Sequence, residues 1–202
     1  MIITRYSFFK YFICCTIVWL GNGCNPSSEG NHQQYAEGQQ VIHIKDKRGN
    51  HIVRLVWDSE NTMIESDQQF WSKPAGSTTY RTEQLPLVEI QTNGLEITAT
   101  TKVASWQIRF LDDTMHILQL GNSPKVIYQV AQPQTDKFWV YKAGREVGKT
   151  KIKNGMIDVD GYGIDLKIPA QTNAYAYTLL MMYDIPETIR FTLMIELLKK
   201  GI

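Results

Sequence analysis

Residues 174–183 read AYAYTLLMMY, an apolar run that no charged residue interrupts. A helix that is apolar on every face is usually buried on every face, so this stretch predicts a buried helix. Asp184 and Glu187 then form a capping-box-like pair, with Pro186 suited to the first position of a helix. A second helix is therefore expected over residues 188–199.

The chain before this run alternates apolar and polar residues in short segments separated by turn-forming residues. A period of two is typical of half-buried strands. About ten short strands are predicted between Val41 and Ile168. Tight turns are expected at Asn93-Gly94, which suits a type I′ turn, and at Asn154-Gly155.

Residues 58–85 break this rhythm because they hold few aliphatic side chains and many Ser, Thr, Gln and Glu residues. The segment is expected to form a long loop, with a short strand or helix at most near Phe70-Trp71. Trp71 is then the tryptophan best placed for exposure to solvent.

The fold class expected for residues 41–202 is a single, mainly β domain with C-terminal helices. The strand series from Val41 to Ile168, followed by the apolar run 174–183, resembles the tubby C-terminal-like family, in which a closed antiparallel barrel surrounds one hydrophobic helix. The resemblance implies a binding or scaffold role more readily than catalysis, and it puts the second helix outside the barrel. A β-sandwich with the helices packed on one open face is the alternative.

Residues 1–23 have the three parts of a secretory signal: a start carrying Arg5 and Lys10, a short apolar centre, and a small polar end. Gly23-Cys24 resembles the cleavage site of bacterial lipoproteins, in which the cysteine is acylated, with palmitate among the expected acyl groups. The third position before the cysteine departs from that family's pattern, because Gly21 stands where leucine is preferred. An uncleaved membrane anchor is the alternative.

Cys24 is the only cysteine expected in the mature chain, since Cys14 and Cys15 belong to the apolar centre of the signal. One cysteine cannot form an intramolecular disulfide, whereas acylation gives it a role. A spare thiol in a soluble secreted or periplasmic protein is the other interpretation. Residues 24–40 are rich in Gln, Ser and Gly and predict a flexible tether.

Net charge excludes a general attraction to nucleic acid. The whole chain carries +1, and loss of the signal with its two basic residues leaves about −1.

Two motifs resemble ligand-binding loops. Residues 143–150 end in Gly-Lys-Thr like a phosphate-binding loop, but the alternating Lys151-Ile152-Lys153 that follows leaves no room for the required helix. A hairpin turn is therefore expected there. Residues 158–165 place three aspartates around two glycines, yet Met156 and Lys167 occupy positions where a calcium loop needs acids, so a polar turn is predicted.

The remaining candidate groups also favour structural roles. His43 and His51 could face each other across a first hairpin, but two imidazoles without a third ligand do not make a zinc site. Asp112-Asp113 lies between two apolar runs and is expected to form a turn. No catalytic, cofactor-binding or metal-binding residue is assigned, and Cys24 is the one predicted modification site.

The sequence thus predicts an envelope lipoprotein with a noncatalytic binding or scaffold domain. Its expected partners are the membrane, through lipidated Cys24, and a hydrophobic ligand or an envelope protein. A carrier of lipid or another hydrophobic ligand is one alternative, and a hydrolase of envelope polymers is the other.

Overall fold

The computed structural model of the protein describes residues 38–83, 85–161, 164–169 and 175–202. Fourteen antiparallel strands follow one another, and each pairs with its neighbour in sequence. The strands are β1 Gln40–Lys45, β2 His51–Trp57, β3 Asn61–Ser66, β4 Phe70–Pro74, β5 Thr79–Thr82, β6 Leu85–Asn93, β7 Glu96–Thr100, β8 Ser105–Leu111, β9 Thr114–Leu120, β10 Lys125–Gln134, β11 Lys137–Lys142, β12 Arg145–Lys153, β13 Met156–Gly161 and β14 Ile164–Pro169.

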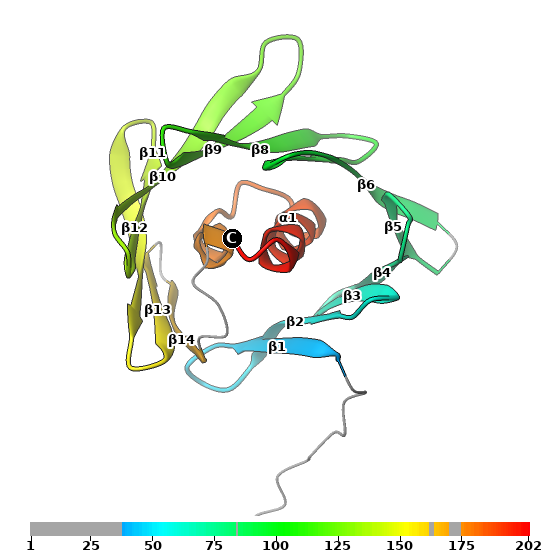
Figure 1. The fold of residues 1–202 in the computed structure, drawn as a ribbon, viewed down its shortest axis with the longest axis horizontal. Coiled ribbons are helices and arrows are strands. Elements are labelled where there is room, and N and C mark those ends of the chain that lie inside the picture. The colour runs from blue at the N-terminus through cyan, green and yellow to red at the C-terminus, as the bar shows by residue number, and fades with distance from the viewer. Residues whose placement is uncertain (1–37, 84, 162–163, 170–174) are drawn as a thin grey trace, which may run out of the picture. The chain divides into compact units, whose positions relative to one another are not determined.

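This meander curls into a nearly closed barrel (Figure 1). The predicted class, mainly β with C-terminal helices, is confirmed, and the barrel replaces the sandwich alternative. β1 and β14 meet at a seam at which the described residues form no ladder of paired strands. An ion pair between Lys47, in the loop after β1, and Asp165 of β14 crosses the seam.

The prediction of a long loop over residues 58–85 is wrong, because β3, β4 and β5 lie within it. The inward side chains of these strands include Thr62 and Ser66 beside Ile64, so the inward face does not stand out as apolar in the sequence. Trp71, expected to be exposed, is fully buried on β4.

Two helices occupy the lumen of the barrel (Figure 1). Residues Tyr175–Met181 form a 3₁₀ helix, η1, that is buried from Ala176 onward, so the predicted buried apolar helix is confirmed. Helix α1, Glu187–Lys199, also lies inside the ring of strands and is buried on almost every face. The expectation that the second helix lies outside the barrel is therefore wrong.

The turn between the two helices differs from the predicted capping box. Pro186 occupies the N-cap position of α1, with no side-chain hydrogen bond to the helix start. Asp184 instead forms an ion pair with Lys142 at the end of β11. This pair connects the helix turn to the rim of the barrel.

Alternation along the strands builds the core, as in β13, where Ile157 and Val159 point inward between partly exposed neighbours. At one point the helices approach the sheet too closely for any side chain. A Cβ atom on Gly148 of β12 would lie 2.4 Å from Sδ of Met181 and 2.8 Å from the carbonyl oxygen of Asp160. Glycine is thus required where η1 packs against β12 and β13.

Hairpin turns follow the predicted chemistry in most places. Asn154 and Gly155 both have positive φ, as a type I′ turn requires. The β6–β7 turn is shifted, because Asn93 pairs with Glu96 and the two turn residues are Gly94 and Leu95. Only Gly94 of these has positive φ, which corrects the type I′ assignment toward type II′.

The two ends of the barrel are distinct. We call the end where η1 leads into α1 the turn end; the β1–β2 loop, residues 46–50, and the start of β14 border it. We call the other the terminal end, where Nζ of Lys200 donates to the carbonyl oxygen of Gly94. Gln40, the first residue of β1, lies at the end of that strand remote from the turn end.

Candidate functional site

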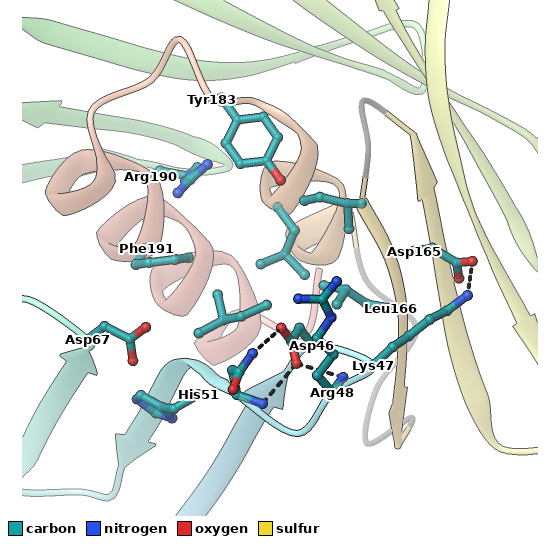
Figure 2. Close-up of a pocket in the computed structure, with 14 residues that line it drawn as sticks. Asp46, Lys47, Arg48, His51, Asp67, Asp165, Leu166, Tyr183, Arg190 and Phe191 are labelled. Carbon is teal, nitrogen blue, oxygen red and sulfur yellow. Dashed lines mark hydrogen bonds and ion pairs between the residues drawn. The ribbon is translucent and has the colours of Figure 1, made fainter.

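A pocket of about 860 Å³ opens at the turn end (Figure 2). Four parts of the fold form its walls: the β1–β2 loop with the start of β2, the β3–β4 turn, the start of β14, and the helix turn with its flanking residues. Its lining residues are Asp46, Lys47, Arg48, Asn50, His51, Ile52, Asp67, Ile164, Asp165, Leu166, Leu180, Tyr183, Arg190 and Phe191.

Asp46 holds the β1–β2 loop in shape. Its carboxylate accepts hydrogen bonds from the backbone N–H of Arg48 at 2.8 Å and from the backbone N–H and side-chain amide of Asn50 at 2.8 and 2.7 Å. The pKa of Asp46 is lowered overall. Desolvation alone would raise it, but the hydrogen bonds from Asn50 and Arg48 to the carboxylate have the larger combined effect. This carboxylate is therefore already engaged by its own loop.

Arg190 of α1 is the buried charge of the pocket. Only 8% of its surface is exposed, and neither Nε nor Nη1 has a hydrogen-bond partner among the described residues. Its guanidinium carbon lies 5.1 Å from the ring centre of Tyr183 and 4.9 Å from that of Phe191. Burial lowers the pKa of Arg190, while the nearby Glu187 opposes that shift.

A buried polar network holds α1 against β4 and β5. Glu196 accepts hydrogen bonds from Nζ of Lys73 and from the hydroxyl of Tyr80, both at 2.7 Å. Burial works to raise the pKa of Glu196, but these two bonds prevail and lower it. Burial raises the pKa of Tyr80 well above its ordinary value, and the neighbouring Glu196 adds to the effect. The tyrosine thus remains a donor.

Two further bonds continue this contact along the helix. Nε1 of Trp71 donates to Oγ1 of Thr192 at 3.0 Å, and Nζ of Lys199 donates to Oγ1 of Thr62 at 2.9 Å. Thr192, Glu196 and Lys199 of α1 therefore face the strands β3 to β5. The inward side chains of these strands include the polar Thr62 and Tyr80. This match fixes the rotation of the helix and, with it, the position of Arg190.

The terminal end has a second hollow, of about 810 Å³, that Tyr175 and Phe110 line. The hydroxyl of Tyr175 donates to the carbonyl oxygen of Asp113 at 2.8 Å, and its ring packs edge-on against Phe110 and Phe138. This hollow has no buried charge like Arg190 among the residues that line it. The pocket at the turn end is the better candidate site.

The phosphate-loop-like segment is a hairpin, as predicted. Ala143 and Gly144 both have positive φ and form the two-residue turn between Lys142 and Arg145. Lys149, the lysine of the motif, lies on β12 with its Nζ 3.6 Å from Asp160 of the adjacent strand. No helix follows the turn, so the amides that would bind a phosphate are absent from this part of the described chain.

The aspartates of residues 158–165 are spread over two strands. Asp158 and Asp160 lie on β13, and Asp165 lies on β14 opposite Asp160. Lysines of the neighbouring strands alternate with them in a ladder of opposite charges. Within the described residues, no cluster of three His, Cys, Asp or Glu side chains has the arrangement of a metal site.

The histidines do not face each other as suggested. His43 pairs with Arg54, while His51 pairs with Lys45. Nε2 of His51 lies 3.2 Å from the carbonyl oxygen of Glu65. Asp112-Asp113 forms the predicted β8–β9 turn, with positive φ at both residues.

Sequence reasoning missed the roles of Arg190 and Glu196, the two charged residues in the interior of α1. Arg190 and Glu196 were visible as the only charges between Thr188 and Leu198. In a helix that is buried, each of them is a candidate for a functional or stabilising contact. Cys24, the predicted lipidation site, lies outside the described residues, as does the signal.

Comparison with protein families, with curated proteins and with solved structures yields no match. The site therefore has to be interpreted from its own geometry. In the described part of the chain, neither helix is long and apolar enough to cross a bilayer.

Proposed function

We propose that this chain is an exported lipoprotein, anchored through Cys24, whose barrel is a noncatalytic binding module. The anchor rests on sequence alone: the signal-like residues 1–23 and the Gly23-Cys24 site. The binding role rests on one structural observation, the open pocket at the turn end with the buried Arg190 in its wall, whose Nε and Nη1 have no hydrogen-bond partner among the described residues. Buried polar groups without hydrogen-bond partners are uncommon in folded proteins, and a bound ligand is one way in which they are satisfied.

Neither alternative receives comparable support. A carrier that encloses a hydrophobic ligand needs an empty lumen, and here η1 and α1 fill the barrel with fully buried side chains. A hydrolase needs a nucleophile or a bound water beside a base. The titratable groups of the pocket, such as Asp46 and Asp165, are instead engaged in structural bonds.

The anchor is tested by mass spectrometry of the protein purified from its native envelope. We expect a mature chain that begins at Cys24 and carries acyl groups. Cys24→Ser should abolish the acylation and release the protein from the membrane fraction. Cys15→Ser, in the same leader, is the matched control and should leave acylation unchanged.

Three results would overturn the anchor: an unmodified N-terminus at another residue, Met1 retained in a soluble protein, or normal membrane retention of Cys24→Ser. The binding role has a separate test. Affinity purification or ligand analysis should give the same partner or ligand for wild-type protein and for Cys24→Ser, since the anchor only places the barrel. A partner lost together with the anchor would argue for membrane contact alone.

A further inference from the structure

Arg190 is held in an environment that is unfavourable for a charge without a partner. It projects from the first turns of a helix that is buried on almost all sides. Two of its nitrogens are inaccessible to water and make no hydrogen bond within the described residues. Leaving buried donors unsatisfied costs free energy, more so for a charged group. A ligand that supplies hydrogen-bond acceptors to these nitrogens would remove this cost.

The acidic residues of the same pocket do not neutralise Arg190. Asp46 accepts three bonds from its own loop, and Asp165 pairs with Lys47 across the seam. Asp67 also lines the pocket, and Glu187 precedes Arg190 by one helical turn. No carboxylate of the described residues comes within ion-pair distance of the guanidinium.

The rest of the wall combines apolar side chains with donors at the rim. Leu180 and Phe191 come from the helices and Leu166 from β14, while Arg48 and Asn50 come from the loop (Figure 2). A pocket of this size and mixture suits a small organic molecule with one polar group.

Tyr183 lies beside Arg190 (Figure 2), with its ring centre 5.1 Å from the guanidinium carbon. It is 53% exposed, so its ring has room to turn aside on the fast timescale of surface side chains. Movement of this side chain would uncover the part of the guanidinium that its ring now contacts. Phe191 would continue to pack against the other side of the guanidinium.

We propose that the turn-end pocket binds an amphipathic oxyanion, with Arg190 donating to its carboxylate or phosphate oxygens and Leu166, Leu180 and Phe191 packing on its apolar part. Guanidinium groups pair with both kinds of oxyanion through charge-assisted hydrogen bonds. This inference deepens the proposed function, because it names the chemistry that the binding module would recognise. It does not depend on the anchor.

The test uses the full-length protein in nanodiscs of neutral phosphatidylcholine, with empty nanodiscs as the blank. Octanoate and octyl phosphate are titrated by calorimetry, beside octanol, octyltrimethylammonium and inorganic phosphate. We expect saturable one-to-one binding of at least one octyl oxyanion. We expect at least about tenfold weaker binding of the three other compounds. Octanol and octyltrimethylammonium lack the negative charge, and inorganic phosphate lacks the apolar part.

Arg190→Gln should weaken binding of the octyl oxyanion by about tenfold or more. The matched control is Arg145→Gln, because Arg145 is exposed in the β11–β12 turn and does not line the pocket. It should bind as the wild type does. Thermal unfolding followed by circular dichroism verifies that each variant is folded. If Arg190→Gln does not fold, Arg190→Lys replaces it, with a smaller loss expected because the charge remains.

The inference is overturned if no octyl oxyanion binds saturably, if octanol binds equally well, or if the folded Arg190 variant binds like the wild type. Failure here is distinguishable from failure of the anchor. A barrel that binds octyl phosphate but carries an unmodified Cys24 would refute the lipoprotein assignment and support the pocket.

Discussion

Glu196 is expected to be the most sensitive polar residue of the barrel interior. Its side chain is 9% exposed and that of its partner Lys73 is 12% exposed, so water screens the 2.7 Å pair weakly. Removing one partner of a buried pair costs about 3–5 kcal/mol, because the other charge is left without compensation. Glu196→Gln retains an acceptor for the hydroxyl of Tyr80 and should lie near the lower limit, about 3 kcal/mol.

The double variant Lys73→Met/Glu196→Gln isolates the charge pair. Methionine keeps the apolar stem of Lys73, and glutamine can still accept from Tyr80, so most of the stability should return. We expect a coupling free energy of about 2 kcal/mol from urea unfolding of the four proteins. Glu65→Gln is the control, since the Arg54–Glu65 pair is half-exposed, and its effect should stay below about 1 kcal/mol. Single effects that simply add to within about 0.5 kcal/mol would refute the reasoning.

The same contact predicts a pH dependence. Because the pKa of Glu196 is lowered in the folded protein, its contribution to stability is fully present above the ordinary pKa of a glutamate. The contribution is lost as the pH falls through the lowered value. Wild-type protein should therefore lose more stability than Glu196→Gln in an acid titration of the unfolding midpoint, and parallel curves would contradict this.

Two further predictions concern packing. Gly148→Ala should destabilise the barrel by about 1–3 kcal/mol, because the added Cβ would overlap Met181 and a backbone oxygen. Gly121→Ala is the control and should be nearly neutral, because no atom lies within 4 Å of its Cβ. Thermal melts compare the two, and equal midpoints would show that η1 does not press on β12. Trp71→Phe should cost about 1–3 kcal/mol in urea unfolding through the lost bond to Thr192, while Trp139→Phe on the outer face should cost less than about 0.5 kcal/mol. An equal cost for the two would place Trp71 outside the core.

The sequence revealed the sheet wherever apolar and polar residues alternate clearly. β13 and β14 were predictable because Ile157, Val159, Leu166 and Ile168 recur at every second position. The burial of η1 was also predictable, because residues 174–183 contain no charged side chain.

The missed elements share one physical cause. Strands β3 to β5 point Thr62 and Tyr80 into the barrel, where they meet Lys199 and Glu196 of α1. Hydrophobic patterning assigns such positions to the surface, because it cannot detect that a polar side chain has a buried partner far along the chain. The position of α1 was mispredicted for a different reason, because the family that the chain resembles encloses only one helix.

The candidate site could be predicted only in part. Arg190 was visible as a charge in an apolar helix, but its burial depends on the barrel closing around that helix. The walls of the pocket come from residues 46–52, 67, 164–166 and 180–191, which are brought together only by the meander returning to its start. No local sequence pattern indicates that these distant segments form one pocket.

The order of elements along the chain has a consequence for folding. Each strand pairs with its immediate neighbour, so the sheet can grow hairpin by hairpin with short loop closures. The helical segment from Tyr175 to Ile202 follows all of these strands, yet it supplies the centre of the core. A partly folded sheet would thus expose its apolar inner surface until the helical segment docks. The seam between β1 and β14, where the described residues form no strand pairing, is an opening through which that segment can enter. A chaperone that shields the growing sheet would be most needed in that interval.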